Sequence, residues 1–350
     1  MSKKAFGNNP RLSRFFSRKE ISEVIKKNKL LSLSLKLPVG CNLNCRYCYS
    51  DIERGDISYD EITDIISQAF NLGIGSLSII GEGEPFMYKD KVSDKDIFDL
   101  IKYANRKGLN VIVFTNNTLI DDETARLLFG LDVAVVCKLN SLKAETQDFL
   151  SGVKGSFKKI RKGLLSLEKA GFSKTEKPRL SLHTVICRQN YSEIPKMWVY
   201  CRRRNIIPYF QVFVPPANRN HINNDKLVVE SKKVKELFYL LAAIDWERFG
   251  YRWDPDYTYP IAGLGCSVVK TGCCVDSNAK LQSCGYVGEE IADLRKFSLQ
   301  EVLSWEKMKK IRSFRYHSCN GRDCHFYGCR ALTFNLTDDR FAPDPFFWKK

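Results

Sequence analysis

The hydrophobic pattern changes its period repeatedly between residues 31 and 215. Short runs rich in Val, Ile and Leu predict buried β-strands at residues 31–37, 77–80, 110–114, 133–139, 180–186 and 209–213. Between them, helical spacing of apolar residues predicts helices at residues 59–72, 96–107, 122–129, 157–170 and 193–204. Buried strands that alternate with helices form right-handed βαβ units around a parallel sheet. Six such units are fewer than a closed barrel contains, so the sequence predicts an α/β fold, a partial (β/α)6 TIM-type barrel.

Other segments flank this barrel, which is expected to span residues 31–218. Residues 1–30 are predicted as an N-terminal helical arm, because Phe15, Ile21 and Ile25 have amphipathic spacing. Residues 219–262 are predicted as a linker with one helix at residues 232–244, and residues 263–350 as a small Cys-rich domain. Within that domain, residues 275–284 predict a β-hairpin with its turn at Ser277 and Asn278.

Composition narrows the class of protein. The 350 residues suffice for about two domains, and no apolar run approaches the roughly 18 residues of a membrane-spanning helix. Residues 1–30 show no signal-type apolar stretch, so we expect a cytoplasmic protein without a membrane partner. The net charge is +16, but the basic residues are dispersed and show no aromatic-and-basic RNA-binding signature. We therefore expect a solvated basic surface rather than a nucleic-acid site.

The chain has thirteen cysteines, an odd number for a sequence without an export signal, which favours metal ligation over disulfides. Three of them, Cys137, Cys187 and Cys201, lie singly in apolar runs and are predicted core residues. A cytoplasm that keeps thiols reduced suits metal ligation by the others.

A first cluster of cysteines, Cys41, Cys45 and Cys48, follows the first predicted strand with C-x3-C-x2-C spacing. Loops after the strands of parallel barrels gather at the carboxyl end, where active sites lie. A 4Fe-4S cluster needs four protein thiolates if it is to be fully ligated. Three thiolates would leave one iron open to a small-molecule chelator. The alternative is a structural zinc site, which usually closes with four ligands.

This spacing, with the aromatic Tyr47 before the last cysteine, resembles the signature of the radical S-adenosylmethionine (SAM) enzymes. The resemblance implies that Cys41, Cys45 and Cys48 hold a 4Fe-4S cluster whose open iron binds the amino and carboxylate groups of SAM. It also implies that an external one-electron donor, such as flavodoxin or ferredoxin, feeds the cluster. Cleavage of SAM would then yield a 5'-deoxyadenosyl radical that abstracts a hydrogen atom.

Turns after the next strands extend the resemblance. Gly81-Glu-Gly-Glu-Pro85 is similar to the family's Gly-Gly-Glu-Pro motif, with Glu82 where the first Gly is usual. Thr115-Asn-Asn117 is similar to Thr-Asn-Gly, and Lys138-Leu-Asn-Ser141 stands where many relatives have Ser-Leu-Asp-Gly. The SAM contacts that the resemblance implies are Tyr47, Gly81, Glu82, Gly83, Glu84, Thr115, Asn116, Asn140 and Ser141. Surface turns use Asn just as readily, and His183 is either a barrel-facing residue or a core histidine.

Seven cysteines in the last 85 residues form a second group. It resembles the SPASM extension of radical SAM enzymes, which implies an auxiliary 4Fe-4S cluster held by Cys266, Cys273 or its neighbour Cys274, Cys284 and Cys329. Cys329 lies in Tyr327-Gly-Cys-Arg-Ala331, similar to the family's Gly-Gly-Cys-Arg-Ala. The ligands of a second auxiliary cluster are incomplete, which leaves Cys274, Cys319 and Cys324 as uncertain ligands. The alternative for the group is zinc.

Most relatives with a SPASM extension modify peptides or proteins, so the resemblance implies a peptide maturase. Gly285 stands where sulfatase-maturing relatives have an Asp, which disfavours that activity. One alternative is oxidation, epimerisation or decarboxylation of a sugar, nucleotide-type or tetrapyrrole small-molecule substrate. An alternative of another class is a basic zinc-binding protein that binds nucleic acid.

Overall fold

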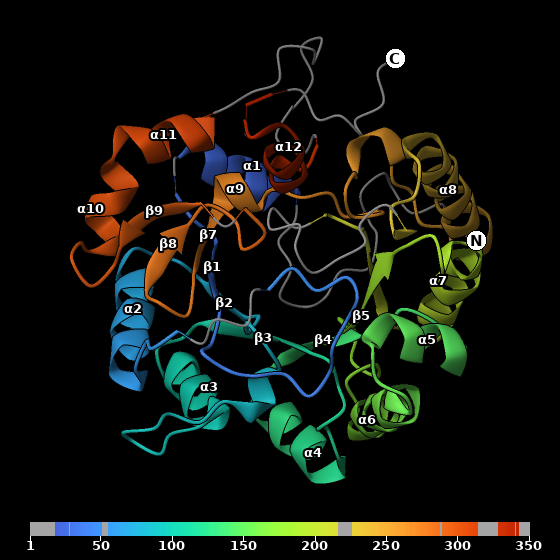
Figure 1. Cartoon of the computed structure of the whole chain (residues 1–350), viewed down its shortest axis with the longest axis horizontal. Coiled ribbons are helices and arrows are strands. Elements are labelled where there is room, and N and C mark those ends of the chain that lie inside the picture. Colours follow the sequence, from blue (N-terminus) through green and yellow to red (C-terminus); the bar gives the residue numbers. More distant parts are fainter. Residues whose placement is uncertain are drawn as a thin grey trace.

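The computed structural model describes residues 18–27, 29–50, 55–215, 226–287, 289–313, 328–339 and 341–342 (Figure 1). Most of the predicted N-terminal arm, and the candidate ligands Cys319 and Cys324, lie outside the described residues. Within the arm, helix α1 (Arg18–Lys26) is present. None of the helices in the described ranges is long and apolar enough to cross a bilayer.

One sheet, with the strand order β6-β5-β4-β3-β2-β1-β7-β8-β9, carries the fold. Its first six strands pair in parallel: β1 (Ser32–Leu35), β2 (Ser76–Ile79), β3 (Asn110–Thr115), β4 (Ala134–Lys138), β5 (Leu180–Ile186) and β6 (Ile207–Val212). The sheet is linear and β6 lies at one edge without pairing back to the other edge, so the barrel is open. The predicted strands and the partial barrel are confirmed.

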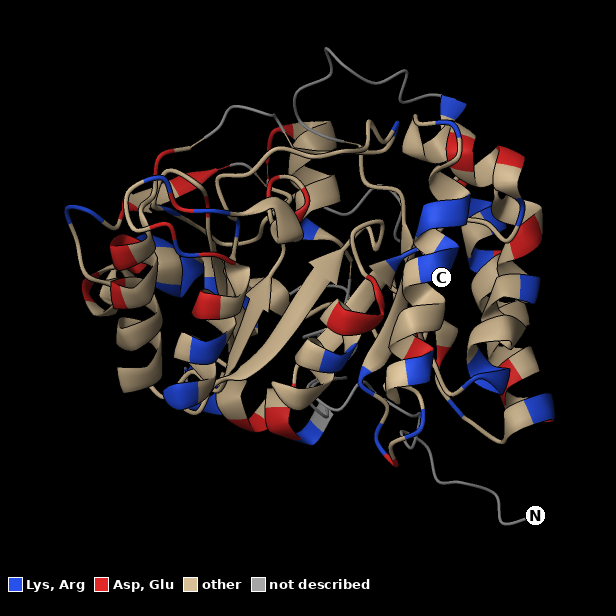
Figure 2. Ribbon diagram, turned by 90° about the horizontal axis from the view of Figure 1, so that it is seen from below, with Lys and Arg blue, Asp and Glu red and all other residues tan. Residues whose placement is uncertain are grey.

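Helices cover the outer face of this sheet: α2 (Tyr59–Asn71), α3 (Ile97–Arg106), α4 (Asp122–Gly130), α5 (Ala144–Ser151), α6 (Ser156–Ala170), α7 (Ile194–Arg203) and α8 (Ser231–Ile244) (Figure 1). All but α5 were predicted. Charged residues lie on these helices and on the loops, whereas the strands carry few (Figure 2).

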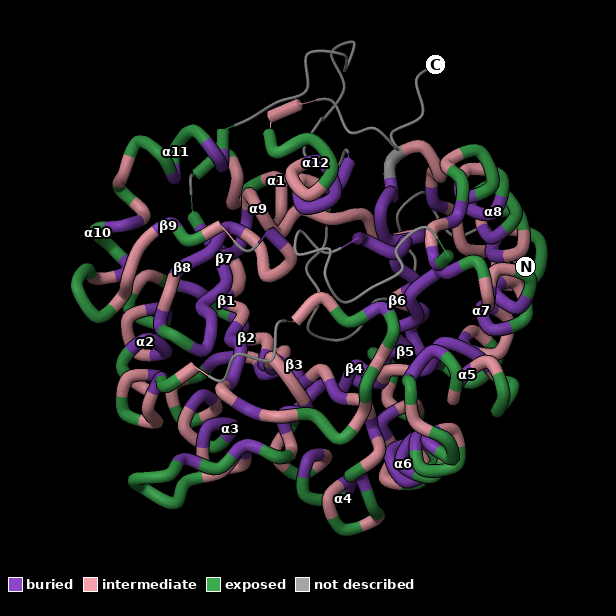
Figure 3. The backbone as a smooth tube through the Cα atoms, viewed as in Figure 1, coloured by how far each residue is buried: buried purple, intermediate pink, exposed green. Residues whose placement is uncertain are grey.

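The two faces of the sheet differ in character. Alternate strand residues such as Leu33, Val111 and Leu180 belong to the main core under the helices, and the strands form the buried centre of the molecule (Figure 3). The opposite, inner face is apolar at Ile112 and Val136, toward the amino ends of the strands. Because side chains alternate along a strand, polar residues near the carboxyl ends of the strands can also point to the inner face.

The predicted hairpin extends the same sheet. Strand β7 (Gly272–Val275) pairs in parallel with β1, and β8 (Lys280–Gln282) and β9 (Glu290–Asp293) follow in antiparallel order. Short helices surround it: α9 (Val268–Thr271), α10 (Leu299–Ser304), α11 (Glu306–Ser313) and α12 (Arg330–Thr337). The turn at Ser277 and Asn278 is confirmed, whereas the pairing of β7 with β1 was not predicted.

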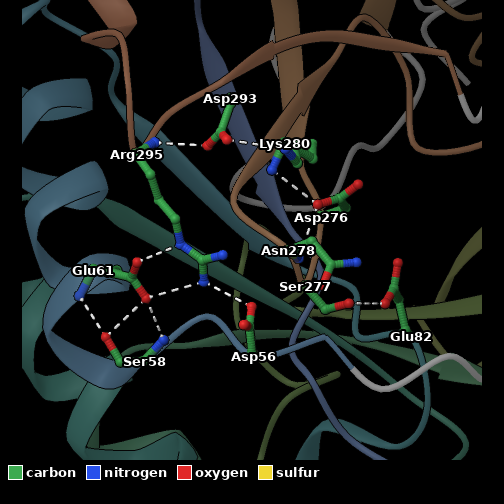
Figure 4. A network of polar contacts seen from close by, with 10 residues as sticks. All are labelled: Asp56, Ser58, Glu61, Glu82, Asp276, Ser277, Asn278, Lys280, Asp293 and Arg295. Carbon is green, nitrogen blue, oxygen red and sulfur yellow. Dashed lines mark hydrogen bonds and ion pairs between the residues drawn. The ribbon is translucent and has the colours of Figure 1, made fainter.

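Polar contacts fix the hairpin to the barrel (Figure 4). The Arg295 guanidinium donates to Glu61 on α2 (2.6 Å) and to Asp56 (2.7 Å). Glu61 also accepts from the Ser58 amide (2.7 Å) in the capping box that starts α2. Lys280 pairs with Asp293 within the hairpin at 3.0 Å. The hairpin therefore has a defined position next to Asp56 and the start of α2.

Asp245 joins three segments at the edge of the barrel. Its buried carboxylate accepts from the indole N–H groups of Trp198 on α7 (2.8 Å) and of Trp253 (2.9 Å). The Arg202 guanidinium donates to both carboxylate oxygens, at 2.8 and 2.6 Å. Asp245 directly follows α8, so these contacts hold the end of α8 against α7.

We expect Asp245→Ala to lower the free energy of unfolding by about 3–5 kcal/mol, because it leaves a buried guanidinium without its counter-ion. Urea unfolding followed by circular dichroism measures this loss. Asp122→Ala, which removes an exposed partner of Lys169, is the matched control and should unfold like the wild type. Equal stability of the two variants would contradict the assignment of Asp245 as a structural hub.

Candidate active site

The loop at residues 38–50 carries the first three cysteines from the carboxyl end of β1. Its backbone is tied to the end of α5, since the Asn44 amide donates to the Ser151 carbonyl (3.1 Å) and the Arg46 amide to the Leu150 carbonyl (2.9 Å). Gly152 permits this contact: its φ is +69°, and a Cβ there would lie 2.0 Å from the Asn44 carbonyl oxygen. The unpredicted helix α5 therefore supports the cysteine loop.

The three thiols project from this loop with different exposure. Cys41 and Cys48 are exposed and Cys45 is partly buried, and all three are free thiols. Burial raises the pKa of Cys45 to about 12, and charge on Cys48 or Cys41 adds to the effect. Desolvation of the sulfur by the surrounding loop also raises the pKa of Cys41, although the residue as a whole is exposed. A bound metal centre would stabilise the thiolates against this penalty, so the donor set suits a cluster of irons.

Among the described residues, no three His, Cys, Asp or Glu side chains are grouped as ligands of a single metal ion. In a 4Fe-4S cluster each cysteine binds its own iron. The C-x3-C-x2-C spacing of Cys41, Cys45 and Cys48 is compatible with a 4Fe-4S cluster, which is larger than a single metal ion.

The glycine-containing turn after β2 packs directly on the cysteine loop. The Glu84 amide donates to the Gly40 carbonyl at 3.0 Å. A Cβ on Gly83 would lie 2.1 Å from the Gly40 carbonyl oxygen, so glycine is required there for close approach of the two backbones. The turn and the cysteine loop therefore form one wall of the site.

Glu84 connects that wall to the next turn. Its buried carboxylate accepts from the Thr115 hydroxyl (2.7 Å), the Asn116 amide (2.6 Å) and the Phe86 amide (3.3 Å). Burial raises the pKa of Glu84 to about 7, against the effect of these hydrogen bonds. The side chains of Glu84 and Thr115 thus position two loops.

Glu82, which replaces a usual glycine, points toward the hairpin. Its carboxylate accepts a hydrogen bond from the Ser277 hydroxyl (Figure 4). It also pairs with the Lys36 ammonium at 3.6 Å. Burial raises the pKa of Glu82. Glu82 therefore connects the turn beside the cysteine loop to the tip of the Cys-rich hairpin, a contact that local sequence does not indicate.

Asn116 is a predicted contact residue that lies beside a cysteine. Its amide nitrogen donates to Asn42 Oδ1 (2.7 Å) and lies 3.7 Å from Cys41 Sγ, while its amide oxygen accepts from the Thr118 amide at 3.0 Å. The adjacent Asn117, with φ of +71°, adopts the left-handed conformation that its place at a usual glycine requires.

Asn140 and Ser141 are buried and bonded within the protein. Asn140 donates from Nδ2 to the Tyr47 hydroxyl (2.7 Å) and accepts at Oδ1 from the Val185 amide (2.8 Å). Ser141 donates to the Glu193 carboxylate at 2.7 Å. These side chains hold Tyr47 and the turn after β4 in place, and their predicted contact with SAM stays a prediction.

The later cysteines divide between the two faces of β7. Cys273 belongs to the helix-side core with Leu33, its partner in β1. Cys274 is paired with Ser34 on the inner face, where it is within electrostatic range of Cys284 and Lys36. Burial raises the pKa of both Cys273 and Cys274.

Cys266, Cys284 and Cys329 share a neighbour on the inner face. All three lie within electrostatic range of Tyr209, and Cys284 and Cys329 are also within electrostatic range of Tyr286. Cys329 caps α12, where its sulfur accepts from the Leu332 amide at 3.4 Å. The structure therefore gathers Cys266, Cys284 and Cys329 toward the mouth of the barrel, and Cys274 lies beside Cys284.

Sequence reasoning gave no role to Lys138, Tyr209 or Tyr286. Lys138 lies within electrostatic range of the first cysteine group, Tyr209 of the second, and Tyr286 of both. Tyr286 stacks on Tyr49, which follows Cys48, with ring centroids 4.0 Å apart. A signal was available for Lys138, because a lysine inside an otherwise apolar strand is unusual. His183 lies on the inner face, beside Lys138, as one of its two interpretations predicted.

Comparisons with known proteins identify relatives of this arrangement. The model of the radical SAM superfamily matches residues 35–198. The AdoMet-dependent heme synthase of Methanosarcina barkeri is 24% identical over 346 residues, which cover 90% of this chain and 95% of the relative. The PqqA peptide cyclase of Granulibacter bethesdensis is 23% identical over 345 residues, covering 90% and 86%.

Among solved structures, Streptococcus suis SuiB bound to S-adenosylmethionine superposes with a TM-score of 0.66. The match has 19% sequence identity and covers 95% of this chain and 80% of that one. At this identity the likeness establishes the fold, a partial barrel with a C-terminal extension.

Proposed function

The chain is a radical SAM enzyme, and we propose that the thiols of Cys41, Cys45 and Cys48 bind a 4Fe-4S cluster whose open iron takes SAM. The observation that carries this proposal is the placement of the three thiols at the carboxyl end of a parallel partial barrel, against the Gly83 turn. When bound, the cluster and SAM would supply a 5'-deoxyadenosyl radical that abstracts a hydrogen atom from the substrate. This proposal is preferred over the alternative of a zinc protein that binds nucleic acid.

The chain's own residues would prepare the site. Glu84 holds the turns that carry Gly83 and Asn116 against the cysteine loop. Tyr47, anchored by Asn140, closes the barrel beneath that loop and helps to exclude water. An external one-electron donor of the flavodoxin or ferredoxin class would reach the cluster through its exposed side, where Cys41 and Cys48 lie.

An auxiliary 4Fe-4S cluster is proposed at the second cysteine group. Its ligands would be Cys266, Cys274, Cys284 and Cys329. Cys274 replaces Cys273 in this assignment because β7 directs Cys274 to the inner face and Cys273 into the helix-side core. These free thiols suit a reducing compartment such as the cytoplasm.

A tetrapyrrole with carboxylate side chains is the proposed substrate class. The heme synthase similarity, which spans 90% of this chain and 95% of the relative, supports it. The basic balance of the chain, with a net charge of +16, would favour the approach of such an anionic substrate.

A peptide or protein, the substrate expected from the sequence, is the second candidate. The similarity to PqqA peptide cyclase, over 90% of this chain, favours it. A second SuiB structure, bound to the precursor peptide SuiA, shows that a protein with this fold accommodates a peptide.

Coproporphyrin III, a carboxylate-bearing tetrapyrrole, tests the substrate class. We expect its Soret band to shift on titration with anaerobically reconstituted enzyme. We also expect 5'-deoxyadenosine formation from SAM and dithionite to rise several-fold, because a bound substrate commits the enzyme to turnover. Liquid chromatography with mass spectrometry measures the nucleoside. Formation of 5'-deoxyadenosine without any response to the porphyrin would contradict the tetrapyrrole and favour the peptide.

A further inference from the structure

Lys36 is buried directly after β1, on the inner face of the sheet. Leu35 belongs to the core under the helices, so the next side chain, that of Lys36, turns to the opposite face. Ser34 shares that face, and its partner in β7 is Cys274. The Lys36 amide donates to the Val275 carbonyl at 2.9 Å, which continues the pairing of β1 with β7 by one residue. The strand register therefore places Lys36 on the same side of the sheet as Cys274, a proposed ligand of the auxiliary cluster.

The end of the Lys36 side chain lies beside the Cys274 sulfur. A Cβ built on Gly285 would lie 3.4 Å from Lys36 Cε and 3.4 Å from Cys274 Sγ, so these two atoms border the same point. Gly285 directly follows Cys284, another proposed ligand. Lys36 is also the charged group that acts most strongly on the Cys274 thiol. The lysine is therefore next to two of the cysteines that would hold the auxiliary cluster.

The ion pair of Lys36 with Glu82 has a defined direction. The Glu82 carboxylate accepts a hydrogen bond from the Ser277 hydroxyl, in the turn of the hairpin (Figure 4). The Lys36 ammonium lies 3.6 Å from that carboxylate and 5.8 Å from the centre of the Tyr49 ring. The carboxylate is thus held at the hairpin turn, while the lysine side chain ends beside Cys274.

Little water reaches this ion pair. The exposed fraction of the side chain is 8% for Lys36 and 15% for Glu82. The cost of desolvating two buried charges offsets much of their attraction, so such a pair is weak evidence for a contribution to stability. Salt screens buried charges much less than exposed ones. The field of Lys36 therefore acts on its neighbours, which favours an electrostatic role in addition to packing.

We propose that Lys36 sets the reduction potential of the auxiliary cluster. The inference rests on the proposed function, in which Cys274 and Cys284 are cluster ligands, and it adds a residue that tunes the cluster without binding it. Thiolate ligands make the cluster negative, and an added electron makes it more so. A buried cation beside these ligands stabilises the reduced state and raises the potential. A higher potential makes the cluster a better acceptor of one electron.

Glu82 is expected to oppose this effect. Its carboxylate compensates part of the Lys36 charge at a distance of 3.6 Å. Removal of the lysine charge and removal of the carboxylate charge should therefore shift the potential in opposite directions. A role in packing alone would not depend on the sign of the charge removed.

A redox titration followed by electron paramagnetic resonance tests the proposal on the anaerobically reconstituted holoenzyme. The auxiliary signal is identified as the one that persists when Cys41, Cys45 and Cys48 are replaced by alanine. The titration compares the potential of this signal in the wild type and in the variants.

Three variants change the ion pair and one serves as control. Lys36→Met removes the positive charge, Lys36→Arg retains it, and Glu82→Gln removes the negative charge while its amide oxygen can still accept from Ser277. Lys280→Met is the matched control, because Lys280 forms an ion pair with Asp293 in the same hairpin but is more exposed than Lys36 (Figure 4).

We expect Lys36→Met to lower the potential of the auxiliary cluster by about 59 mV or more, which corresponds to about a tenfold change in a one-electron equilibrium. Glu82→Gln should raise the potential, because the charge of Lys36 is then uncompensated. Lys36→Arg and Lys280→Met should keep a potential close to that of the wild type. The proposal is overturned if Lys36→Met keeps the wild-type potential, or if Lys36→Met and Glu82→Gln shift it in the same direction.

Iron analysis of each protein separates this inference from the proposed function. If Lys36→Met binds no auxiliary cluster, Glu82→Gln decides: a raised potential supports the role of Lys36, and an unchanged or lower potential overturns it. A wild type with about four irons and no auxiliary signal would instead overturn the proposed auxiliary cluster itself.

Discussion

Replacing Cys41, Cys45 and Cys48 together by alanine is expected to lower the iron content from about eight to about four atoms per chain, on four irons per 4Fe-4S cluster. The same variant should form no 5'-deoxyadenosine from SAM and dithionite. The physical reason is that these thiols project from one loop at the carboxyl end of the barrel, where the Gly83 turn packs on the loop backbone and the Asn116 side chain lies beside Cys41. Iron and sulfide analysis after anaerobic reconstitution, with nucleoside analysis alongside, measures both effects.

A cysteine from the core provides the control. Cys201 is buried on α7, away from both cysteine groups, so Cys201→Ala should keep the full iron content despite a modest loss of stability. Zinc in place of iron in the wild type would contradict the cluster assignment. A wild-type content of about twelve irons would show a second auxiliary cluster in addition to the one proposed here.

The barrel was predictable because its signals are local. Each βαβ unit has its own run of Val, Ile and Leu followed by helical spacing, and the six parallel strands appear where those runs lie. The pairing of β7 with β1 was not predictable in this way. Strand β7 has four residues, Gly272–Val275. So short a segment does not indicate that its pairing strand lies more than 200 residues away in the chain.

The position of the catalytic loops was predictable, but the use of their side chains was not. Motif spacing placed Cys41, Gly83 and Asn116 at strand ends, and barrel geometry brought them together. Glu82 and Asn140 stay predicted SAM contacts, and their side chains bond to Ser277 and Tyr47 respectively, two partners that the sequence did not indicate. Such partners depend on distances between loops that the order of residues does not encode.

The hairpin joins the two cysteine groups through contacts of β1 and the first loop. Lys36, the residue directly after β1, pairs with Glu82 and lies 5.8 Å from the centre of the Tyr49 ring. Tyr49 in turn stacks on Tyr286, two residues after Cys284. Because these contacts connect the loop of Cys48 with that of Cys284, a shift of one loop would displace the other.

The second large effect is expected from the adjacent cysteines of β7, of which only Cys274 is assigned as a ligand of the auxiliary cluster. We expect Cys274→Ala to lower the iron content from about eight to about four atoms per chain, and Cys273→Ala to leave it near about eight. Strand parity decides the difference, because Cys274 shares the inner face with Ser34 and lies beside Cys284, whereas Cys273 is packed with Leu33 under the helices. Iron analysis and low-temperature electron paramagnetic resonance of the reduced proteins measure it.

Each of the two variants is the other's control, since both remove one buried thiol from the same strand. Cys273→Ala should lose stability through the cavity it leaves in the core, while its auxiliary signal persists. Cys274→Ala should lose the auxiliary signal and still bind the cluster of Cys41, Cys45 and Cys48. Loss of about four irons from Cys273→Ala alone would contradict the register-based assignment and restore Cys273 as the ligand. Loss from neither variant would mean that the auxiliary cluster takes no ligand from β7, and that the hairpin only supports the loop of Cys284.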